Sequence, residues 1–584
     1  MTFMDPLRVR RIFTAFLLLV GFALVLFRLF NLQVLQAGEL AVKAERQHEK
    51  AITLQGGRGT IYDRQGKVLA INVEVPSVFG VPTSLEDPAP VARQLGRVLH
   101  VRPDEIEKKL KQDRSFVWIA RKVDPEQGRR LQRMPLEGIG LVLEGRRYYP
   151  KGTLLSHVIG FAGMDGEGLE GIERRYDSYL RGEKQTVVLQ RDALGRTVFP
   201  KGLLQQGPSS GHSVVLTIDE TIQYIAEKEL EEAVTASRAK GGTVIVMEPR
   251  TGAILAMALV PTFDPNSFGS LYADRWRNRA VTDVYEPGST LKVLLAAAAL
   301  EDRVMEPQTI LFGERGSMTV GNTVIHDHDP SGWMTFAQVL ERSSNIGAVK
   351  TALALGPERL SRVLRAFGFG ERSEIDLPGE AAGLVRDTRS WGRRSLASIA
   401  MGQEVAVTPV QLTAALSAVA NGGWLMKPHV VAEIRDAKGQ TVFQASPLVR
   451  RQPISAGTAQ KLTRILEGAV TRGTGKSAAV SGYRVAGKTG TAQKVDPRTG
   501  TYSTTLFIGS FVGFVPAEDP RLCILVVIDE PQTQSWGGVV AAPVFRRVAE
   551  QVLPYLGVTP KEPVRVALAQ AETIGAHRAG RAGR

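Results

Sequence analysis

The chain has 584 residues, too many for one ordinary domain, so the sequence predicts two or three modules with separate cores. Its formal net charge of +14 favours polyanionic surroundings, either nucleic acid or an anionic membrane surface. The single cysteine, Cys523, excludes an intramolecular disulfide, and the apolar run around it predicts a buried thiol.

The first predicted element is a membrane-spanning helix. Residues 12–27 carry no charge, and a helix over 12–35 would be about 36 Å long, enough to cross a bilayer. Three arginines, Arg8, Arg10 and Arg11, stand immediately before it, so the positive-inside rule predicts a cytoplasmic N-terminus and places the rest of the chain outside. A cleaved signal peptide is the alternative, but the long run favours an uncleaved anchor.

Residues 36–205 predict a mixed α/β module. Within it, 58–70 predicts two short strands joined by a turn, and 104–112 predicts a helix. No pattern in this module indicates catalysis. We expect a pedestal or interaction module, which follows the anchor formed by residues 1–35.

Residues 206–560 predict a second, larger domain. Five strands are expected, at 242–247, 253–259, 484–492, 505–515 and 522–529. The last two are joined too tightly for a crossover helix, so they should pair antiparallel. The predicted fold class is therefore α+β, with a mainly antiparallel five-stranded sheet assembled from both ends of the domain and flanked by helices.

Helices are predicted to cover that sheet. One spans 220–236 with Asp219 as its N-cap, a mostly helical stretch fills 289–421, and another helix spans 542–556. The tail over 561–584 is rich in Ala, Gly and Arg, and we expect it to be disordered.

The first chemically informative string is Ser289-Thr290-Leu291-Lys292. Pro287-Gly288 interrupts the chain before a helix predicted over 291–300, so Ser289 should lie at a helix N-terminus, where negative charge is favoured. Lys292 lies on the same helical face, and a buried lysine loses affinity for its proton and can act as a base. Ser-x-x-Lys also arises by chance in many helices.

The second string, Ser343-Ser344-Asn345, lies between helices predicted over 333–342 and 346–355. In a tight turn, Ser343 and Asn345 could face one cleft, where the serine relays a proton and the asparagine holds a substrate amide. Helix capping is the simpler alternative for these residue types.

The third string, Lys488-Thr489-Gly490-Thr491, continues a predicted strand. Gly490 permits the close approach of another backbone, and such an edge could pair with an extended peptide and bind its terminal carboxylate. A solvated edge strand protected by a lysine is the alternative.

Other motifs suggest rival functions. Residues 482–489 fit the Walker A pattern and 524–530 imitate a Walker B strand, but 496–500 cannot form the helix that a phosphate-binding loop requires. Residues 207–211 fit a nucleophile elbow without its strand-to-helix context. Residues 326–329, His-Asp-His-Asp, could ligate a metal, yet no third ligand is evident and no metal is expected.

The three strings in this order resemble the active site of the penicillin-binding proteins and serine β-lactamases. Ser344, where many β-lactamases carry aspartate, favours the penicillin-binding side. Further passages resemble the non-catalytic module of the class B penicillin-binding proteins: 58–70, 147–150 and 168–173. The context at 286–290 is similar to the division-type (FtsI/SpoVD-like) branch of that family.

The resemblance implies a membrane-anchored peptidoglycan D,D-transpeptidase. It implies catalytic roles for Ser289, Lys292, Ser343 and Lys488. It implies substrate binding by Asn345, Thr489, Gly490 and Thr491. In this mechanism the serine attacks the penultimate D-Ala carbonyl of a stem peptide, D-Ala leaves after protonation through Ser343 and Lys488, and an acceptor amine resolves the acyl-enzyme. The backbone N–H groups of Ser289 and Thr491 would form the oxyanion hole. No cofactor is expected.

The resemblance also implies partners. They are stem peptides, β-lactam antibiotics, a SEDS-family glycan polymerase, other division proteins and the inner membrane, without nucleic acid. The catalytic domain would be extracytoplasmic on a single-pass anchor. Four alternatives stay open: an elongation-type class B protein, a D-Ala-D-Ala carboxypeptidase, a β-lactamase-like hydrolase and a non-catalytic division scaffold.

Overall fold

The computed structural model describes residues 6–40, 49–114, 116–191, 197–198, 209–270 and 272–561. The chain divides into two compact units, one of Met1–Gly57 and Gly182–Ser210 and one of Arg58–Arg181 and Gly211–Arg584. Apart from Lys561, the predicted basic tail lies outside the described residues, as do positions 207 and 208 of the elbow-like motif.

The first unit contains the predicted anchor. Helix α1 (Pro6–Phe30) continues into a short π-helical segment, η1 (Asn31–Leu35), and Arg10–Leu35 is long and apolar enough to cross a membrane. The chain therefore carries one N-terminal apolar helix that fits a single-pass anchor. The unit also holds an antiparallel sheet of β1 (Glu49–Gln55), β6 (Lys184–Arg191) and β7 (Thr197–Val198).

The second unit begins with a seven-stranded sheet. Its order is β17 (Thr441–Gln444), β16 (Val431–Arg435), β8 (Ser213–Leu216), β2 (Ile61–Tyr62), β3 (Val68–Gly80) and β4 (Val117–Ala120), with β5 (Ile139–Tyr148) also on β3. The hairpin expected at 58–70 is present, but its second strand is not short, because β3 continues along the whole of β5. Strand β2 pairs in parallel with β8, which joins chain segments far apart in sequence.

Short helices accompany this sheet. They are α3 (Pro88–Leu99), α4 (Pro103–Leu110), α5 (Pro125–Gln132), α6 (Ser156–Ile159), α7 (Gly171–Arg175) and α8 (Asp177–Leu180). The helix predicted over 104–112 is α4. A buried ion network lies beside them, where Glu173 accepts from Arg58 Nε and Arg147 Nε at 2.5 Å each. The buried carboxylate is thus paired on both oxygens, as burial of charge requires.

The five predicted strands form one sheet in which every pair is antiparallel. Its order is β10 (Ile254–Val260), β9 (Gly241–Met247), β21 (Leu522–Asp529), β20 (Tyr502–Val515) and β19 (Ala486–Val495). The strand predictions are confirmed with small boundary shifts, and β19, which carries Lys488, lies at one edge.

Both faces of this sheet are covered. In β21, Cys523 and Leu525 join the core that includes α16 (Pro409–Ala420), whereas Ile524 and Val526 join the core with α9 (Glu220–Ser237) and α19 (Ala542–Tyr555). This two-residue alternation explains why the strand sequence is apolar throughout. Asp219 caps α9 as predicted, and burial raises the pKa of the Cys523 thiol to about 12.

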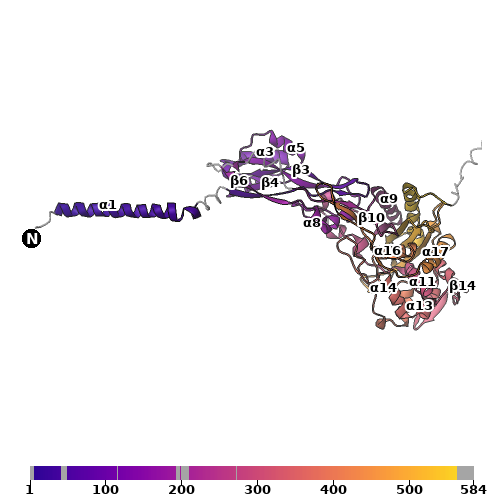
Figure 1. Ribbon diagram of the computed structural model, residues 1–584. Coiled ribbons are helices and arrows are strands. Elements are labelled where there is room, and N and C mark those ends of the chain that lie inside the picture. Colours follow the sequence, from indigo (N-terminus) through magenta and orange to yellow (C-terminus); the bar gives the residue numbers. More distant parts are fainter. Residues whose placement is uncertain are drawn as a thin grey trace, which may run out of the picture. The chain divides into compact units, whose positions relative to one another are not determined.

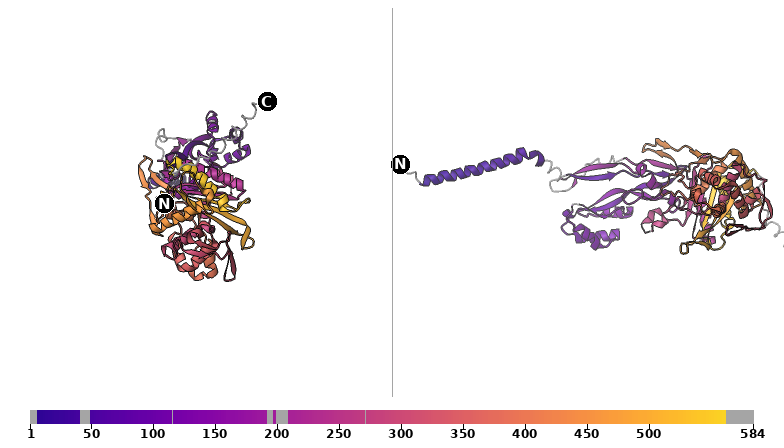
Figure 2. Two further views of the ribbon diagram at one scale, coloured as in Figure 1. Left: turned by 90° about the vertical axis from the view of Figure 1, so that its right-hand side faces the viewer. Right: turned by 90° about the horizontal axis from the view of Figure 1, so that it is seen from below.

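A helical group containing α11 (Lys292–Glu301), α13 (Asn345–Leu355) and α14 (Pro357–Ala366) lies to one side of the sheet, below the yellow strands in Figure 1 and in the left view of Figure 2. Other elements nearby are α12 (Phe336–Glu341), α15 (Arg393–Ala400), α17 (Ala456–Thr471), β11 (Ile310–Phe312), β12 (Ser317–Val320), β13 (Thr323–His326) and β14 (Trp333–Thr335). The helix expected over 333–342 was wrong at its start. Residues Trp333–Thr335 pair with β11, and Thr335 begins α12 through a capping box with Gln338.

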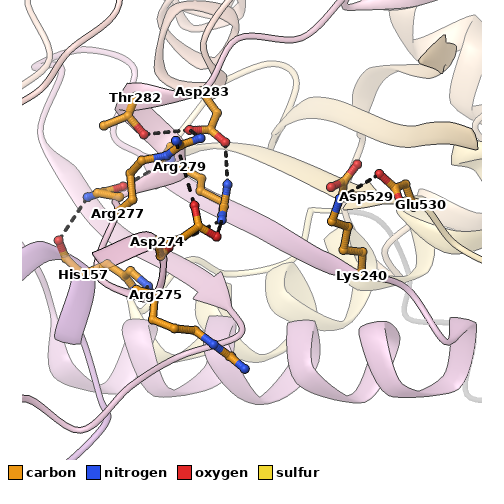
Figure 3. A network of polar contacts seen from close by, with 12 residues as sticks. His157, Lys240, Asp274, Arg275, Arg277, Arg279, Thr282, Asp283, Asp529 and Glu530 are labelled. Atoms are coloured by element: carbon orange, nitrogen blue, oxygen red, sulfur yellow. Dashed lines mark hydrogen bonds and ion pairs between the residues drawn. The ribbon is translucent and has the colours of Figure 1, made fainter. Parts of the chain in front are cut away.

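The segment that leads toward Ser289 is fixed by charge pairs (Figure 3). Arg279 contacts Asp274 at 2.6 Å and Asp283 at 2.8 Å, and Arg277 contacts Asp283 at 2.6 Å. The buried His157 of α6 lies 3.1 Å through Nε2 from the carbonyl of Arg275. Ion pairs of Arg279 therefore connect helix α10 (Arg279–Thr282) to the residues before and after it, a few residues ahead of Ser289.

Candidate active site

Ser289 lies in a tight turn at the start of α11. The turn is a 3-10 segment, η5 (Gly288–Leu291), and Thr290 Oγ1 closes it by donating to the carbonyl of Pro287 at 2.8 Å. Gly288 has φ +57°, and a Cβ there would lie 2.9 Å from the carbonyl oxygen of Thr491. The half-buried Ser289 is thus presented at a helix N-terminus against β19, as the first string predicted.

Lys292 connects the first and second strings. Its side chain is 1% exposed, and Nζ donates to the carbonyl of Ser343 at 2.7 Å, to Asn345 Oδ1 at 2.8 Å and to Ser343 Oγ at 3.4 Å. Burial lowers the pKa of Lys292 to about 7, although the charge of Asp327 opposes this shift. An amine with this pKa exchanges a proton near neutral pH.

The second string forms the turn between α12 and α13. Ser343 has φ +60°, a left-handed conformation that is unusual for a residue with a side chain. Ser344 caps α13 by accepting from the N–H of Gly347 at 2.9 Å. Asn345 donates from Nδ2 to the carbonyl of His326 at 2.8 Å, which leaves Oδ1 toward Lys292. Ser344 therefore caps α13, whereas Ser343 and Asn345 contact Lys292.

Lys488 is fully buried within β19. Its Nζ donates to the carbonyl of Thr489 at 3.2 Å and lies 3.4 Å from Thr489 Oγ1. Burial holds the pKa of Lys488 well below its usual value, and the nearby charge of Lys292 lowers it further. The first and third strings are therefore close enough for their lysines to repel each other when both are protonated.

The rest of the third string lines the same edge. Thr489 Oγ1 lies 2.7 Å from Thr474 Oγ1, and the N–H of Gly537 donates to Thr491 Oγ1 at 3.2 Å. A Cβ on Gly490 would lie 2.9 Å from Thr290 Cγ2 and 3.0 Å from the carbonyl oxygen of Pro287. Gly490 thus lets the strand approach the Ser289 turn closely, as the sequence predicted.

Sequence reasoning missed some residues of this site. Thr474 follows α17 and Gly537 begins α18 (Gly537–Val540), and no local motif singles out either residue. Asp327 was visible only as part of a possible metal motif. Within the part of the chain that the structure describes, no group of three His, Cys, Asp or Glu side chains could hold a metal.

The Walker A interpretation fails on the backbone. Strand β19 runs through Lys488 and continues to Val495, and a turn follows at 496–500. A phosphate-binding loop places its lysine at the N-terminus of a helix. Lys488 lies within strand β19, with strand residues before and after it in the sequence, so a phosphate-binding loop is excluded.

Comparison with known proteins agrees with this arrangement. Residues 242–550, more than half of the chain, match the family described as Penicillin binding protein transpeptidase domain, and residues 53–216 match the Penicillin-binding Protein dimerisation domain. The chain is a class B penicillin-binding protein. This penicillin-binding protein is accordingly a peptidoglycan D,D-transpeptidase of the class B family.

Relatives of this penicillin-binding protein match it over most of its length. Stage V sporulation protein D of Bacillus subtilis is 36% identical over 563 residues, which cover 95% of this chain and 87% of that protein. Peptidoglycan D,D-transpeptidase FtsI of Escherichia coli is 31% identical over 553 residues, 93% of this chain and 91% of that protein.

Solved structures are similar as well. Penicillin binding protein 3 of Mycobacterium tuberculosis in complex with aztreonam has a TM-score of 0.69 and 29% identity, covering 88% of this penicillin-binding protein and 99% of that chain. A peptidoglycan synthetase from Bifidobacterium adolescentis has a TM-score of 0.71 and 27% identity, covering 88% and 98%.

Proposed function

We propose that this class B penicillin-binding protein forms its acyl-enzyme on Ser289 and that Lys292 is the base. The observation that carries the proposal is the buried Lys292 Nζ, whose pKa is lowered to about 7 and which contacts Ser343 and Asn345. Lys292 follows Ser289 by three residues at the start of α11, and a neutral amine there can take the proton of Ser289 as its Oγ attacks the penultimate D-Ala carbonyl.

The tetrahedral intermediate then collapses. We expect the backbone N–H groups of Ser289 and Thr491 to bind the oxyanion, which is typically worth a few kcal/mol. The proton on Lys292 returns through Ser343 Oγ to the leaving D-Ala amine as the C–N bond breaks. Burial and the positive charge of Lys292 both lower the pKa of Lys488, so Lys488 binds its proton less readily while Lys292 is protonated.

We assign substrate binding to residues of the second and third strings. Asn345 orients the donor peptide, and the hydroxyls of Thr489 and Thr491 bind its terminal carboxylate beside Gly490. An acceptor amine then attacks the Ser289 ester, forming the crosslink and releasing the serine. β-Lactams resemble the donor peptide and acylate the same oxygen, a proposal supported by the aztreonam complex of the similar penicillin binding protein 3.

The test is labelling of the intact chain with fluorescent penicillin. The native protein should be labelled covalently, and Ser289→Ala should abolish the label while leaving the thermal unfolding midpoint nearly unchanged. Label that persists in the variant would assign the nucleophile elsewhere. An intact protein that takes no label would contradict the acyl-enzyme itself.

We also propose a role in septal wall synthesis. The support is the identity with sporulation protein D and FtsI, together with the Glu286–Thr290 context seen in the sequence. Residues 1–35 would anchor the protein, 36–205 would form the pedestal, and 206–560 would form the extracytoplasmic transpeptidase domain. A SEDS-family polymerase and other division proteins are its proposed partners in the inner membrane.

A further inference from the structure

Asp327 joins the substrate-binding turn from outside it. It follows β13, and its backbone N–H donates to the carbonyl of Gly316 at 3.1 Å, which fixes its position independently of α13. The residue is 9% exposed. Its sequence neighbours His326 and His328 suggested a metal site, but the structure turns the carboxylate toward the Ser343–Asn345 turn.

The carboxylate accepts three hydrogen bonds there. Oδ2 accepts from Ser344 Oγ at 2.6 Å, and Oδ1 accepts from the N–H groups of Asn345 at 2.5 Å and Ile346 at 3.0 Å. A carboxylate at a helix N-terminus is stabilising, so helix capping alone would explain part of this arrangement. Within the described chain, Ser344 accepts only from the N–H of Gly347, so Asp327 completes the cap of α13, and its bond from Ser344 Oγ also ties the turn itself to the loop after β13.

The charge of Asp327 acts on the proposed base. Among the described residues, the charged groups that face Lys292 are Lys488 from β19 and Asp327 from the loop after β13. The direct partners of Lys292 in the turn, Ser343 and Asn345, are neutral. Among these groups Asp327 therefore carries the negative charge that favours the protonated form of Lys292.

We propose that Asp327 is a positioning residue for acylation: its carboxylate fixes the Ser343–Asn345 turn, whose side chains contact Lys292, and it brings a negative charge to that turn. The inference rests on the proposed roles of Ser289 and Lys292. The proposal assigns a role in acylation to a residue of the loop after β13, which belongs to neither the first nor the second string.

The proposal is tested by the pH profile of acylation. The rate constant for fluorescent penicillin acylation of the intact, detergent-solubilised chain is measured from about pH 5 to pH 9. In the native protein the rate should rise through about pH 7, where Lys292 loses its proton. Asp327→Asn has nearly the same shape and keeps one acceptor oxygen for the backbone N–H groups, but it removes the charge and turns the acceptor for Ser344 into an amide donor. Without the negative charge, the midpoint should fall by about 0.5–1 unit. Relative to its own plateau, the rate on the acid side should then be about 3- to 10-fold higher.

Two further variants separate charge from shape. Asp327→Glu retains the charge on a longer side chain, so it should lower the plateau without moving the midpoint. Asp329→Asn removes an exposed carboxylate two residues away and should change neither quantity.

The outcomes are distinct. The proposal is overturned if Asp327→Asn lowers only the unfolding temperature and leaves the midpoint of the acylation pH profile unchanged. Asp327 would then act as a helix cap alone. If the Asn variant does not fold, Asp327→Glu decides, because a midpoint that moves despite the retained charge contradicts it. Absence of label in the native chain would instead reject the proposed acyl-enzyme.

Discussion

Lys292 and Lys488 derive their chemistry from burial. The spacing Ser289-x-x-Lys292 predicted a lysine on the serine's helical face, and this is where the structure has it. The low pKa of Lys292 could not be predicted from spacing, because it results from burial in the packed domain, where the polar partners of Nζ come from the turn after α12, 51 and 53 residues further along the chain. Desolvation is a property of the packed chain and is invisible in a local motif.

His157 gives a second titration, remote from the cleft. Burial lowers the pKa of His157 from 6.5 to about 4, with a further contribution from Arg279. Between about pH 6.5 and pH 4, His157 is therefore protonated in the unfolded chain but neutral in the folded chain. The free energy of unfolding consequently falls as the pH drops through this range, by up to about 3 kcal/mol. Replacement by glutamine removes this proton uptake.

We expect His157→Gln to make the thermal unfolding midpoint less sensitive to pH between pH 7 and pH 4.5. The measurement is differential scanning fluorimetry across that range. His328→Gln, at an exposed position, is the matched control and should keep the native slope. An unchanged slope in the His157 variant would mean that the folded protein accommodates the protonated ring.

At the scale of elements, the strands were predictable and some boundaries were not. Strands β9, β10 and β21 and most of β20 are apolar runs, so their existence could be predicted from sequence, whereas β19 follows the short apolar start at Val485-Ala486 and then carries polar residues. The helix expected from Trp333 begins at Phe336 instead, although the signal Thr335-x-x-Gln338 was present. Periodicity alone extended the helix across a strand that pairs with β11.

The contact between β19 and the Ser289 turn gives an element-scale prediction. A methyl group on Gly490 would meet Ser510 Oγ at 2.4 Å and the carbonyl oxygen of Pro287 at 3.0 Å, so the strand and the turn must separate. We expect Gly490→Ala to lower the rate constant of penicillin acylation by about 10- to 100-fold, because small displacements of reacting groups have large effects.

Stopped-flow measurement of acylation tests this expectation. Gly457→Ala in α17 is the control, since a Cβ at Gly457 meets no heavy atom within 4 Å, and acylation should stay at the native rate. Native acylation in Gly490→Ala would show that the turn and the strand move independently.

At the scale of the whole molecule, the pairing of strands that lie far apart in the chain could not be predicted from the sequence. The seven-stranded sheet joins β2, β8 and β16, which are separated by more than a hundred residues at each step. Short strands such as Ile61–Tyr62 carry too little pattern to reveal their partners. The sheet unites strands from both sides of the proposed boundary between residues 205 and 206.

The apolar N-terminal helix supports a prediction about partners. We expect replacement of residues 12–35 by an unrelated membrane helix to preserve membrane association and penicillin labelling, because the catalytic residues lie in the other compact unit. Co-purification of a SEDS-family polymerase and enrichment of a fluorescent fusion at the septum should both be lost. Unchanged co-purification would move the contact outside the helix, and an intact fusion spread along the lateral wall would favour the elongation-type alternative.

Cys523 has a practical consequence for experiments on this protein. It is the only cysteine of the chain, and it lies fully buried in β21 with Sγ 3.7 Å from the carbonyl of Thr413. Its raised pKa keeps it as the unreactive thiol at neutral pH. A cysteine introduced anywhere on the surface would therefore be the sole reactive thiol, so probes or crosslinkers can be attached at chosen positions without first altering the native sequence.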